Sequence, residues 1–559
     1  MAETQLIELL AEALQACRAC GDLPECEVEI RLEQPPRPDM GDFSCNIAMQ
    51  MAKPAGKAPR EVAQAIIERL QEQGGLLQRC EIAGPGFINL FLSPTWLQDS
   101  VRDVLLLGDS YGHSNAGAGT KVQVEFVSAN PVGPLHIGNA RGGPFGDSLA
   151  RLLRAVGHDV EREYLLNDGA DNTQFRLFCA SVLARAREIL GLEWEIPENG
   201  YRGEYIIDYA RELIERHGED TFAQMPVDDD GAYRVARLAE EVVVAEIRET
   251  LGLLGIEFEN WFSERALFEE GAIERKIEQL RERGVAYEHD GALWLRTTDF
   301  GDEEDRVLVR STGAKTYIMT DLAYVENKLA RGFDHCIYVW GPDHAAQVPS
   351  VKAGMAAAGV DPGATEFIIH QIVRLTEGGE VVKMSKRAGK IVTLRQLIED
   401  VGADVTRFFL LSRSVDAHLD FDLDLARRES DENPVYYVQY AHARICSILR
   451  EAHERGMATD DLQEADFSLL EHPDELRLMR WMADYPSEVL AAAQQRAPHR
   501  LAHLSRDLAA TFHQFYGNCR VIDEEAPELS RARLALISAA RQVLRNILSL
   551  LGVSAPETM

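Results

Sequence analysis

The hydrophobic and polar positions of this chain change their period at about residue 121. Apolar residues alternate over 121–127, follow helical spacing over 145–156, and become extended again over 160–166. The same order recurs later, with a strand, a helix and a strand over 335–341, 343–358 and 366–373. Strands that alternate with helices predict a parallel, doubly wound sheet.

The segments on either side follow other patterns. Helical periodicity covers 4–16 and 60–73, and 84–94 is typical of a short buried strand, which together predict a small α+β unit. Residues 172–255 are mostly helical and acidic, and we expect an insertion into the sheet there. After about residue 435 only amphipathic helices are predicted.

The predicted fold class is therefore α/β, with a doubly wound, Rossmann-like parallel sheet between an N-terminal α+β domain and a C-terminal all-α helical bundle. A chain of 559 residues is too long for one core. The expected units are an N-terminal domain, a sheet domain that contains the insertion, a loop and contact region, and a bundle, over 1–108, 109–380, 381–432 and 433–559.

Composition narrows the class of protein. A hydrophobic content of 46% with 27% charged residues is ordinary for a soluble globular protein. No uninterrupted apolar stretch is as long as a bilayer requires, and the acidic start lacks the features of a secretory signal. We expect a cytoplasmic protein without a membrane partner.

The net charge of −33 argues against a polyanionic partner without excluding one, because affinity for nucleic acid depends on local basic stripes. Over 491–545 eight arginines outnumber five acidic residues, which gives 8 − 5 = +3. A solvated helical face is an equally good interpretation of any one of these arginines.

Nine cysteines are scattered along the chain, and Cys17 and Cys20 form a C-x-x-C pair. No second pair or nearby histidine pair completes a zinc site, so we favour free buried thiols. No structural metal is expected.

The first candidate site is the segment 131–141, PVGPLHIGNAR, which follows the strand at 121–127. In a doubly wound sheet such a loop meets the ligand at the start of a helix. Gly133 and Gly138 allow close backbone approach, and His136 and Asn139 are spaced to donate to the same phosphate oxygens. The alternative is a capped helix with an incidental histidine.

The second candidate site is the segment 381–389, VVKMSKRAG, which predicts a flexible cationic loop. Positive charge held near a developing anion is typically a large catalytic contribution. A solvated lysine loop is the alternative. We expect the two segments to grip one triphosphate from opposite sides, with the second contributing Lys383, Met384, Ser385 and Lys386.

These two segments resemble the signatures of class I aminoacyl-tRNA synthetases, HIGH and KMSKS. Here they are HIGN at 136–139 and KMSKR at 383–387. Asn139 keeps a donor that does not titrate, and Arg387 adds a charge. Neither departure removes the resemblance.

Within that class the chain is similar to the arginyl-tRNA synthetase family almost from end to end. The similarity is carried by GDFSCNIAM with AGPGFINLFL, by VEFVSANPVGPLHIGNARG, and by GADVTRFFLLSRS leading into NPVYYVQYAHARI, over 41–49, 83–92, 124–142, 402–414 and 433–445. The resemblance implies a ligase that activates L-arginine with Mg²⁺-ATP and transfers it to tRNA(Arg). It also implies that bound tRNA is needed for activation. We expect a monomer.

The resemblance also implies an arginine pocket. Glu125, Glu264, Tyr317 and Asp321 match positions that face the substrate side chain. A planar guanidinium with five donors suits two carboxylates and a phenol, and lysine would leave acceptors unpaired. Taken singly, Glu125 or Glu264 could be a structural ion-pair partner. The rest of the pocket is expected to comprise Ser128, Asn130, His344 and Gln347.

Other functions remain possible from the residues alone. Another class I synthetase or a small nucleotidyltransferase would share the first signature, although small nucleotidyltransferases lack the terminal domains. A non-catalytic RNA-binding or scaffold protein derived from a synthetase is a further alternative. Such proteins tend to lose one signature, and both are present here.

Overall fold

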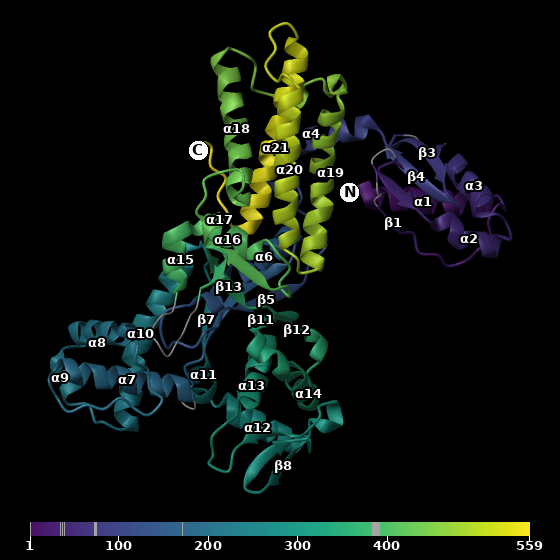
Figure 1. Cartoon of the computed structure of the whole chain (residues 1–559). Coiled ribbons are helices and arrows are strands. Elements are labelled where there is room, and N and C mark those ends of the chain that lie inside the picture. The colour runs from purple at the N-terminus through teal and green to yellow at the C-terminus, as the bar shows by residue number, and fades with distance from the viewer. Residues whose placement is uncertain are drawn as a thin grey trace.

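The computed structural model shows four lobes around a central sheet, with a helical bundle at the top and the N-terminal domain to one side (Figure 1). The structure describes residues 2–559 except 34, 36, 38, 39, 72–74, 170, 171 and 383–391.

The N-terminal domain is a four-stranded antiparallel sheet, in the order β1-β2-β4-β3, covered by helices. Its own core includes Leu10, Ile66 and Leu90, so it folds around a separate hydrophobic centre. The predicted helix over 4–16 and the strand within 84–94 are confirmed, and the helix predicted over 60–73 is confirmed up to Gln71, the last described residue of that range. The elements are α1 (Ala2–Ala19), β1 (Leu32–Glu33), β2 (Phe43–Cys45), α2 (Ile47–Ala55), α3 (Pro59–Gln71), β3 (Leu77–Ala83) and β4 (Phe87–Leu92).

The Cys17–Cys20 pair lies at the end of α1. Cys17 is buried, as expected, but Cys20 is exposed, so the expectation that both thiols are buried is wrong for Cys20. Cys20 follows the last residue of α1, where the chain turns at the surface.

The central sheet has five strands, all parallel, in the order β12-β11-β5-β6-β7, which confirms the doubly wound prediction. β5 is first in the chain but lies in the middle, so the strand order reverses there. Ligands of such sheets bind beyond the carboxyl end at this reversal. The elements are β5 (Lys121–Phe126), α5 (Ile137–Ala140), α6 (Gly142–Ala155), β6 (Asp159–Leu166), β7 (Asn260–Ser263), β11 (His335–Trp340) and β12 (Thr365–Ile369).

Two predicted elements of this sheet domain differ from the structure. The helix expected over 343–358 begins as a 3₁₀ turn, η4 (Pro342–Gln347), and continues as α14 (Val348–Ala358). The strand expected over 366–373 is divided, because β12 ends at Ile369 and Val373 begins β13 in another sheet.

The expected insertion is a helical lobe that projects from the sheet (Figure 1). Its last helix, α10, returns toward the sheet and packs near α15. The elements are α7 (Thr173–Ile189), α8 (Glu204–His217), α9 (Glu219–Ala223) and α10 (Asp229–Leu253).

A second lobe between β7 and β11 was not predicted from the sequence. It contains a small antiparallel sheet, in the order β10-β9-β8, packed with helices around its own core. Its strands have only four residues each, too few to show a clear period. The elements are α11 (Glu264–Glu269), α12 (Ala272–Glu282), β8 (Ala286–His289), β9 (Ala292–Leu295), η3 (Thr298–Phe300), β10 (Arg306–Val309) and α13 (Tyr317–Ala330).

A small mixed sheet connects the central sheet to the bundle. β13 pairs in parallel with β15 and antiparallel with β14. The elements are η5 (Pro362–Ala364), β13 (Val373–Glu377), β14 (Glu380–Val381), α15 (Leu394–Val401), α16 (Ala403–Leu411), β15 (Leu419–Asp422) and α17 (Leu423–Ala426).

The C-terminal part is the predicted helical bundle, and α4 packs against two of its helices, α19 and α21. Of the described helices, α21 alone is long and apolar enough to cross a membrane by length and composition, but 78% of its most apolar window is buried within the protein. The elements are α4 (Pro94–Leu107), η2 (Gly108–Ser110), α18 (Pro434–Glu454), η7 (Leu462–Glu464), η8 (Phe467–Leu469), α19 (Pro473–Gln494), α20 (His499–Asn518) and α21 (Pro527–Leu551).

The arginines of the locally basic stretch 491–545 are largely engaged within the protein. Four of them form ion pairs with acidic residues outside this stretch at 2.7–3.1 Å. Their charge is therefore partly neutralised before any partner approaches. These pairs are Arg496–Glu366, Arg500–Glu488, Arg533–Glu475 and Arg545–Asp109.

A buried ion cluster joins the sheet domain, the insertion and the bundle. Arg407 of α16 donates to the Asp147 carboxylate of α6 at 2.6 Å, and to the carbonyls of Leu254 and Leu551 at 2.7 and 2.9 Å. Arg162 donates to the other Asp147 oxygen at 2.7 Å. Burial raises the pKa of Asp147, but the neighbouring arginine charges outweigh it, and the pKa lies below its ordinary value.

Loss of this cluster is expected to destabilise the protein. Arg407→Met would leave the Asp147 carboxylate with fewer cations in a buried place, at a cost of about 3 kcal/mol or more. Thermal unfolding followed by circular dichroism should show a clearly lower midpoint. Arg374→Met, which breaks an exposed pair with Asp420, should change the midpoint little. Equal midpoints for the two variants would contradict this role.

Candidate active site

The loop after β5 has an unusual backbone that its neighbours hold in place. Val127 and Ser128 have φ values of 66° and 37°, which residues with a side chain rarely adopt. The Leu165 amide donates to Ser128 Oγ at 3.1 Å, and the Asn167 side chain donates to the Ser128 carbonyl at 2.8 Å. The Tyr164 hydroxyl donates to the next carbonyl at 2.9 Å. The start of the loop is therefore fixed to β6 and to the residues that follow it.

His136 lies at the start of α5, as its motif predicts. Its Nδ1 accepts a hydrogen bond from the Gly138 amide at 3.1 Å. The proton of the neutral ring is then on Nε2, which is the nitrogen that can donate to an anion. Asn139 lies within the same short helix.

The first signature contacts the chain just after the second signature. His136 and Thr393 form an antiparallel bridge, and the Ile137 amide donates to the Val392 carbonyl at 3.3 Å. The residues that follow the second signature thus pair with the first. This contact is what a site shared by both segments requires.

The cationic loop itself falls outside the described residues. The chain is described up to Val382, just after β14, and again from Val392. Four predicted site residues therefore have no described position: Lys383, Met384, Ser385 and Lys386.

Glu125 is a buried carboxylate at the carboxyl end of β5. The sheet register places it beside Glu163 on β6, on the same face. Lys328 of α13 lies 2.5 Å from Glu125 and 3.9 Å from Glu163, and Arg331 also donates to Glu163, at 2.6 Å. The structural ion-pair alternative for Glu125 is thus correct for one of its oxygens, Oε2.

Asp321 lies on α13, which begins at Tyr317 four residues earlier, so the two residues share one face of the helix. Tyr317 is 64% exposed. Removal from water raises the pKa of Asp321 to about 8, with further increases from the charges of Glu264 and Glu125, while Lys328 opposes them. Three predicted pocket carboxylates therefore lie close enough to act on one another.

Glu264 begins α11 at the carboxyl end of β7. The Gly169 amide donates to its Oε2 at 3.3 Å. Asp168 accepts from the Arg265 amide at 3.1 Å and from the Ser263 hydroxyl at 2.6 Å, on either side of Glu264. Asp168 therefore fixes the backbone that presents Glu264.

The remaining predicted pocket residues lie at the ends of neighbouring strands. Asn130 donates to the Gln174 side chain at 2.8 Å. His344 and Gln347 lie in the exposed turn η4 after β11, with His344 Nδ1 3.4 Å from Gln347 Oε1. The His344 ring packs near Trp340 at 5.5 Å. Asn130 follows β5, and His344 and Gln347 follow β11, the strand that pairs with β5.

Arg141 was not identified as a site residue from the sequence, although it ends the segment 131–141 that carries the first signature. Its side chain is buried, and removal from water lowers its pKa to about 10. A buried arginine is rare without partners, but its partners lie far along the chain and no local pattern indicates them. It donates to four carbonyls at 2.6–3.2 Å, those of Arg413, Ser414, Val415 and Ala417.

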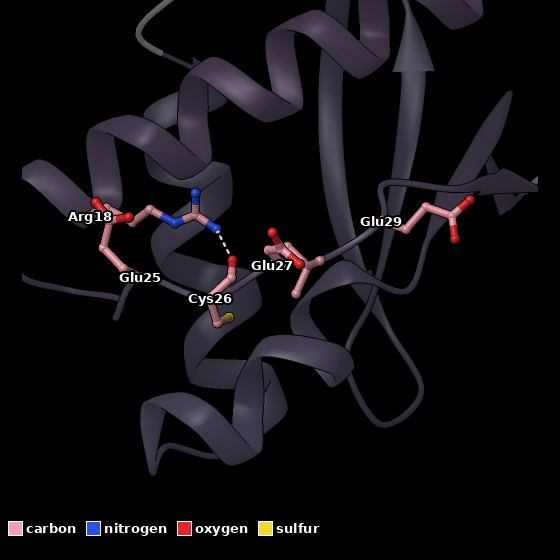
Figure 2. Close-up of a pocket in the computed structure, with 6 residues that line it drawn as sticks. Arg18, Glu25, Cys26, Glu27 and Glu29 are labelled. Carbon is pink, nitrogen blue, oxygen red and sulfur yellow. Dashed lines mark hydrogen bonds between the residues drawn. The ribbon is translucent and has the colours of Figure 1, made fainter.

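A separate pocket lies on the N-terminal domain (Figure 2). Its volume is about 780 Å³, and Arg18 donates to the Cys26 carbonyl at 2.6 Å. Glu25, Glu27 and Glu29 make it acidic. Because none of the signature residues lines it, we assign the chemistry to the sheet edge instead.

The parallel sheet with its strand reversal, and the first signature at its carboxyl edge beside the residues that follow the second, define a class I aminoacyl-tRNA synthetase. Three family models agree: Arginyl tRNA synthetase N terminal domain over 4–92, tRNA synthetases class I (R), catalytic domain over 100–409, and DALR anticodon binding domain over 438–559. The chain belongs to the arginyl-tRNA synthetase family, and its function is the ligation of arginine to tRNA with ATP.

Relatives and solved structures are similar over most of their length. An arginine–tRNA ligase of Syntrophotalea carbinolica is 48% identical over 99% of this chain and 100% of its own, and one of Listeria monocytogenes is 47% identical over 100% of both. The structure of a putative arginyl-tRNA synthetase from Campylobacter jejuni is 33% identical, with a TM-score of 0.76, over 84% of this chain and 100% of its own.

Proposed function

We propose that one site at the carboxyl edge of the sheet catalyses both steps of the ligation. The arginine carboxylate attacks the α-phosphorus of Mg²⁺-ATP, which forms arginyl-adenylate and releases diphosphate. The 2′-hydroxyl of the terminal adenosine of tRNA(Arg) then attacks the carbonyl and releases AMP. No covalent enzyme intermediate is needed, so positioning and electrostatic stabilisation supply most of the acceleration.

The convergence of Glu125, Glu264 and Asp321 on one place is the observation that carries this proposal. Lys328 supplies one internal positive charge to this cluster. When all three carboxylates are ionised, the net charge of the cluster with Lys328 is negative. A permanently charged guanidinium compensates this charge. Tyr317 adds a phenol from the same helix as Asp321.

The polar residues around this cluster would hold the main-chain end of arginine. Asn130 and Ser128 belong to the loop after β5, and His344 and Gln347 to the turn after β11. The two segments follow adjacent strands. We assign them to the α-amino and carboxylate groups.

The ATP side is assigned to the first signature. The backbone at Gly133 and Gly138 has no side chain to keep phosphate away, and His136 donates through Nε2. Asn139 is assigned to the same phosphate. Lys383 and Lys386 are assigned to the departing diphosphate, with Met384 and Ser385 between them in the sequence.

An aromatic cluster on the bundle is proposed to receive the anticodon loop. The rings of Tyr436 and Tyr440 are parallel at 6.4 Å, and Tyr440 stacks on His513 at 5.9 Å. Arg444 lies over Tyr516 at 4.4 Å. Unpaired bases stack on such surfaces. Phe515, in contrast, is fully buried and belongs to the core.

Tyr440 is 41% exposed and offers a direct test of this surface. Tyr440→Ala should raise the KM for tRNA by roughly tenfold, because one base–aromatic stack is worth about 1–3 kcal/mol. Aminoacylation kinetics with varied tRNA would measure this. The similarly exposed Tyr233 of the insertion supplies the control, Tyr233→Ala. Equal KM values for the two variants would show that the surface around Tyr440 does not bind the anticodon loop.

The whole function is tested by ATP–diphosphate exchange with each amino acid, with and without tRNA. Exchange that depends on arginine supports the proposal, and a tRNA requirement would match the family resemblance. Exchange with another amino acid would indicate a different synthetase, and no exchange would favour a scaffold. We further propose that the enzyme acts as a cytoplasmic monomer without a membrane partner.

A further inference from the structure

The insertion touches the ATP side of the loop through an aromatic ring. Tyr205 of α8 lies so close to Gly133 that a Cβ added there would sit 2.7 Å from the ring carbon Cε2. Gly133 also has a φ of 142°, a conformation that residues with a side chain rarely adopt. The ring therefore covers the backbone at the point where we place the phosphates.

A second contact reaches the arginine side of the same loop. Gln174, in the first turn of α7, accepts a hydrogen bond from the Asn130 side chain at 2.8 Å. Asn172 caps α7 by accepting from the amides of Gln174 and Phe175 at 3.1 and 3.2 Å. The first turn of α7 is thus capped where Gln174 meets Asn130.

The insertion also contacts the segment that follows the second signature. Arg395 of α15 lies 2.9 Å from Glu249 of α10 and donates to Thr250 at 3.5 Å. Thr393, two residues earlier, pairs with His136. One lobe therefore contacts the loop that carries the first signature and also the helix that follows the second signature.

This loop has a physical need for such support. The positive φ values of Val127 and Ser128 are strained conformations, which persist only when surrounding contacts fix them. Contacts from β6 hold the beginning of the loop. The contacts to Asn130 and Gly133, in contrast, come from the insertion.

We propose that Tyr205 and Gln174 are positioning residues of this enzyme, acting through the loop on ATP and on arginine respectively. The inference rests on the roles proposed above for Gly133 and Asn130. It gives the insertion a function in the activation step, in addition to any contact with tRNA.

Tyr205→Ala is expected to raise the KM for ATP by roughly tenfold in ATP–diphosphate exchange, because the phosphate-binding backbone would lose its cover and shift. The KM for arginine should change less than about twofold. Tyr205→Phe keeps the ring and should restore the wild-type KM for ATP.

Gln174→Met is expected to show the opposite pattern. Methionine has a similar volume but cannot accept the hydrogen bond from the Asn130 side chain. The KM for arginine should therefore rise by about fivefold, while the KM for ATP stays constant. Gln174→Glu keeps an acceptor and should return the KM for arginine toward the wild-type value.

Tyr201→Ala is the matched control. Tyr201 packs within the insertion, edge-on to Phe178 at 5.9 Å, and its loss should affect both KM values little. The inference is overturned if Tyr205→Ala changes both KM values together, or behaves like Tyr201→Ala. Failure of the proposed function is distinct, because the wild-type enzyme would then show no exchange that depends on arginine.

Discussion

His136→Ala is expected to slow formation of arginyl-adenylate by about 10²–10³-fold, the usual cost of removing one donor from a transition-state anion. The ring accepts from the Gly138 amide through Nδ1, so Nε2 carries the donating proton. The effect should fall on the rate of the chemical step, measured by single-turnover adenylate formation. The affinity for tRNA should change little, because His136 is assigned to the phosphate and is not part of the aromatic surface proposed for the anticodon loop.

The control for this variant is His113→Ala, which removes an exposed histidine outside the loop. It should form adenylate at the wild-type rate. Near-normal activation by His136→Ala would show that the phosphate is stabilised by other groups. A loss of tRNA affinity equal to the loss of rate would indicate a general structural defect.

The second large effect concerns pH. The pKa of Asp321 is raised to about 8 by removal from water and by Glu264 and Glu125. In the empty site this carboxyl is mostly protonated at pH 7, whereas a guanidinium binds the ionised form. Arginine binding should therefore release a proton, and affinity should increase by roughly tenfold for each pH unit up to about pH 8, then level off.

Asp321→Asn should abolish this dependence between pH 6 and 8 and raise the KM for arginine by roughly 100-fold, since a hydrogen bond to a charged group is lost. Calorimetry in buffers of different ionisation enthalpy would count the released protons. Asp290→Asn, at an exposed turn, should keep the wild-type profile. An arginine affinity that does not vary with pH in the wild type would refute the proton exchange.

The pattern of apolar residues was sufficient for the main architecture. The strands at 121–127 and 160–166 and the helix between them were predictable because they are long and their periods are distinct. The four-residue strands β8, β9 and β10 were not, since a segment of that length shows no reliable period. The strand expected over 366–373 was divided in the structure because the chain leaves the sheet after Ile369 and enters another one at Val373.

The candidate site was predictable wherever its residues lie in one motif. His136 and Gly138 are neighbours in sequence, and their contact follows from the helix start. Lys328 and Arg141 were missed because their partners are distant in the chain and only the folded sheet brings them together. The residue type did not indicate a buried position either, since Lys and Arg are usually exposed.

The contacts of Arg407 with Leu254 and Leu551 use main-chain oxygen atoms, which every amino acid possesses. The seam between the bundle and the rest of the enzyme should therefore tolerate extensive drift in the side chains at these two positions, provided that the lengths of α10 and α21 are kept. Chimaeras that exchange the bundle between relatives should accordingly assemble when the helix ending at Leu551 keeps its register, and fail when a single residue is added or removed there.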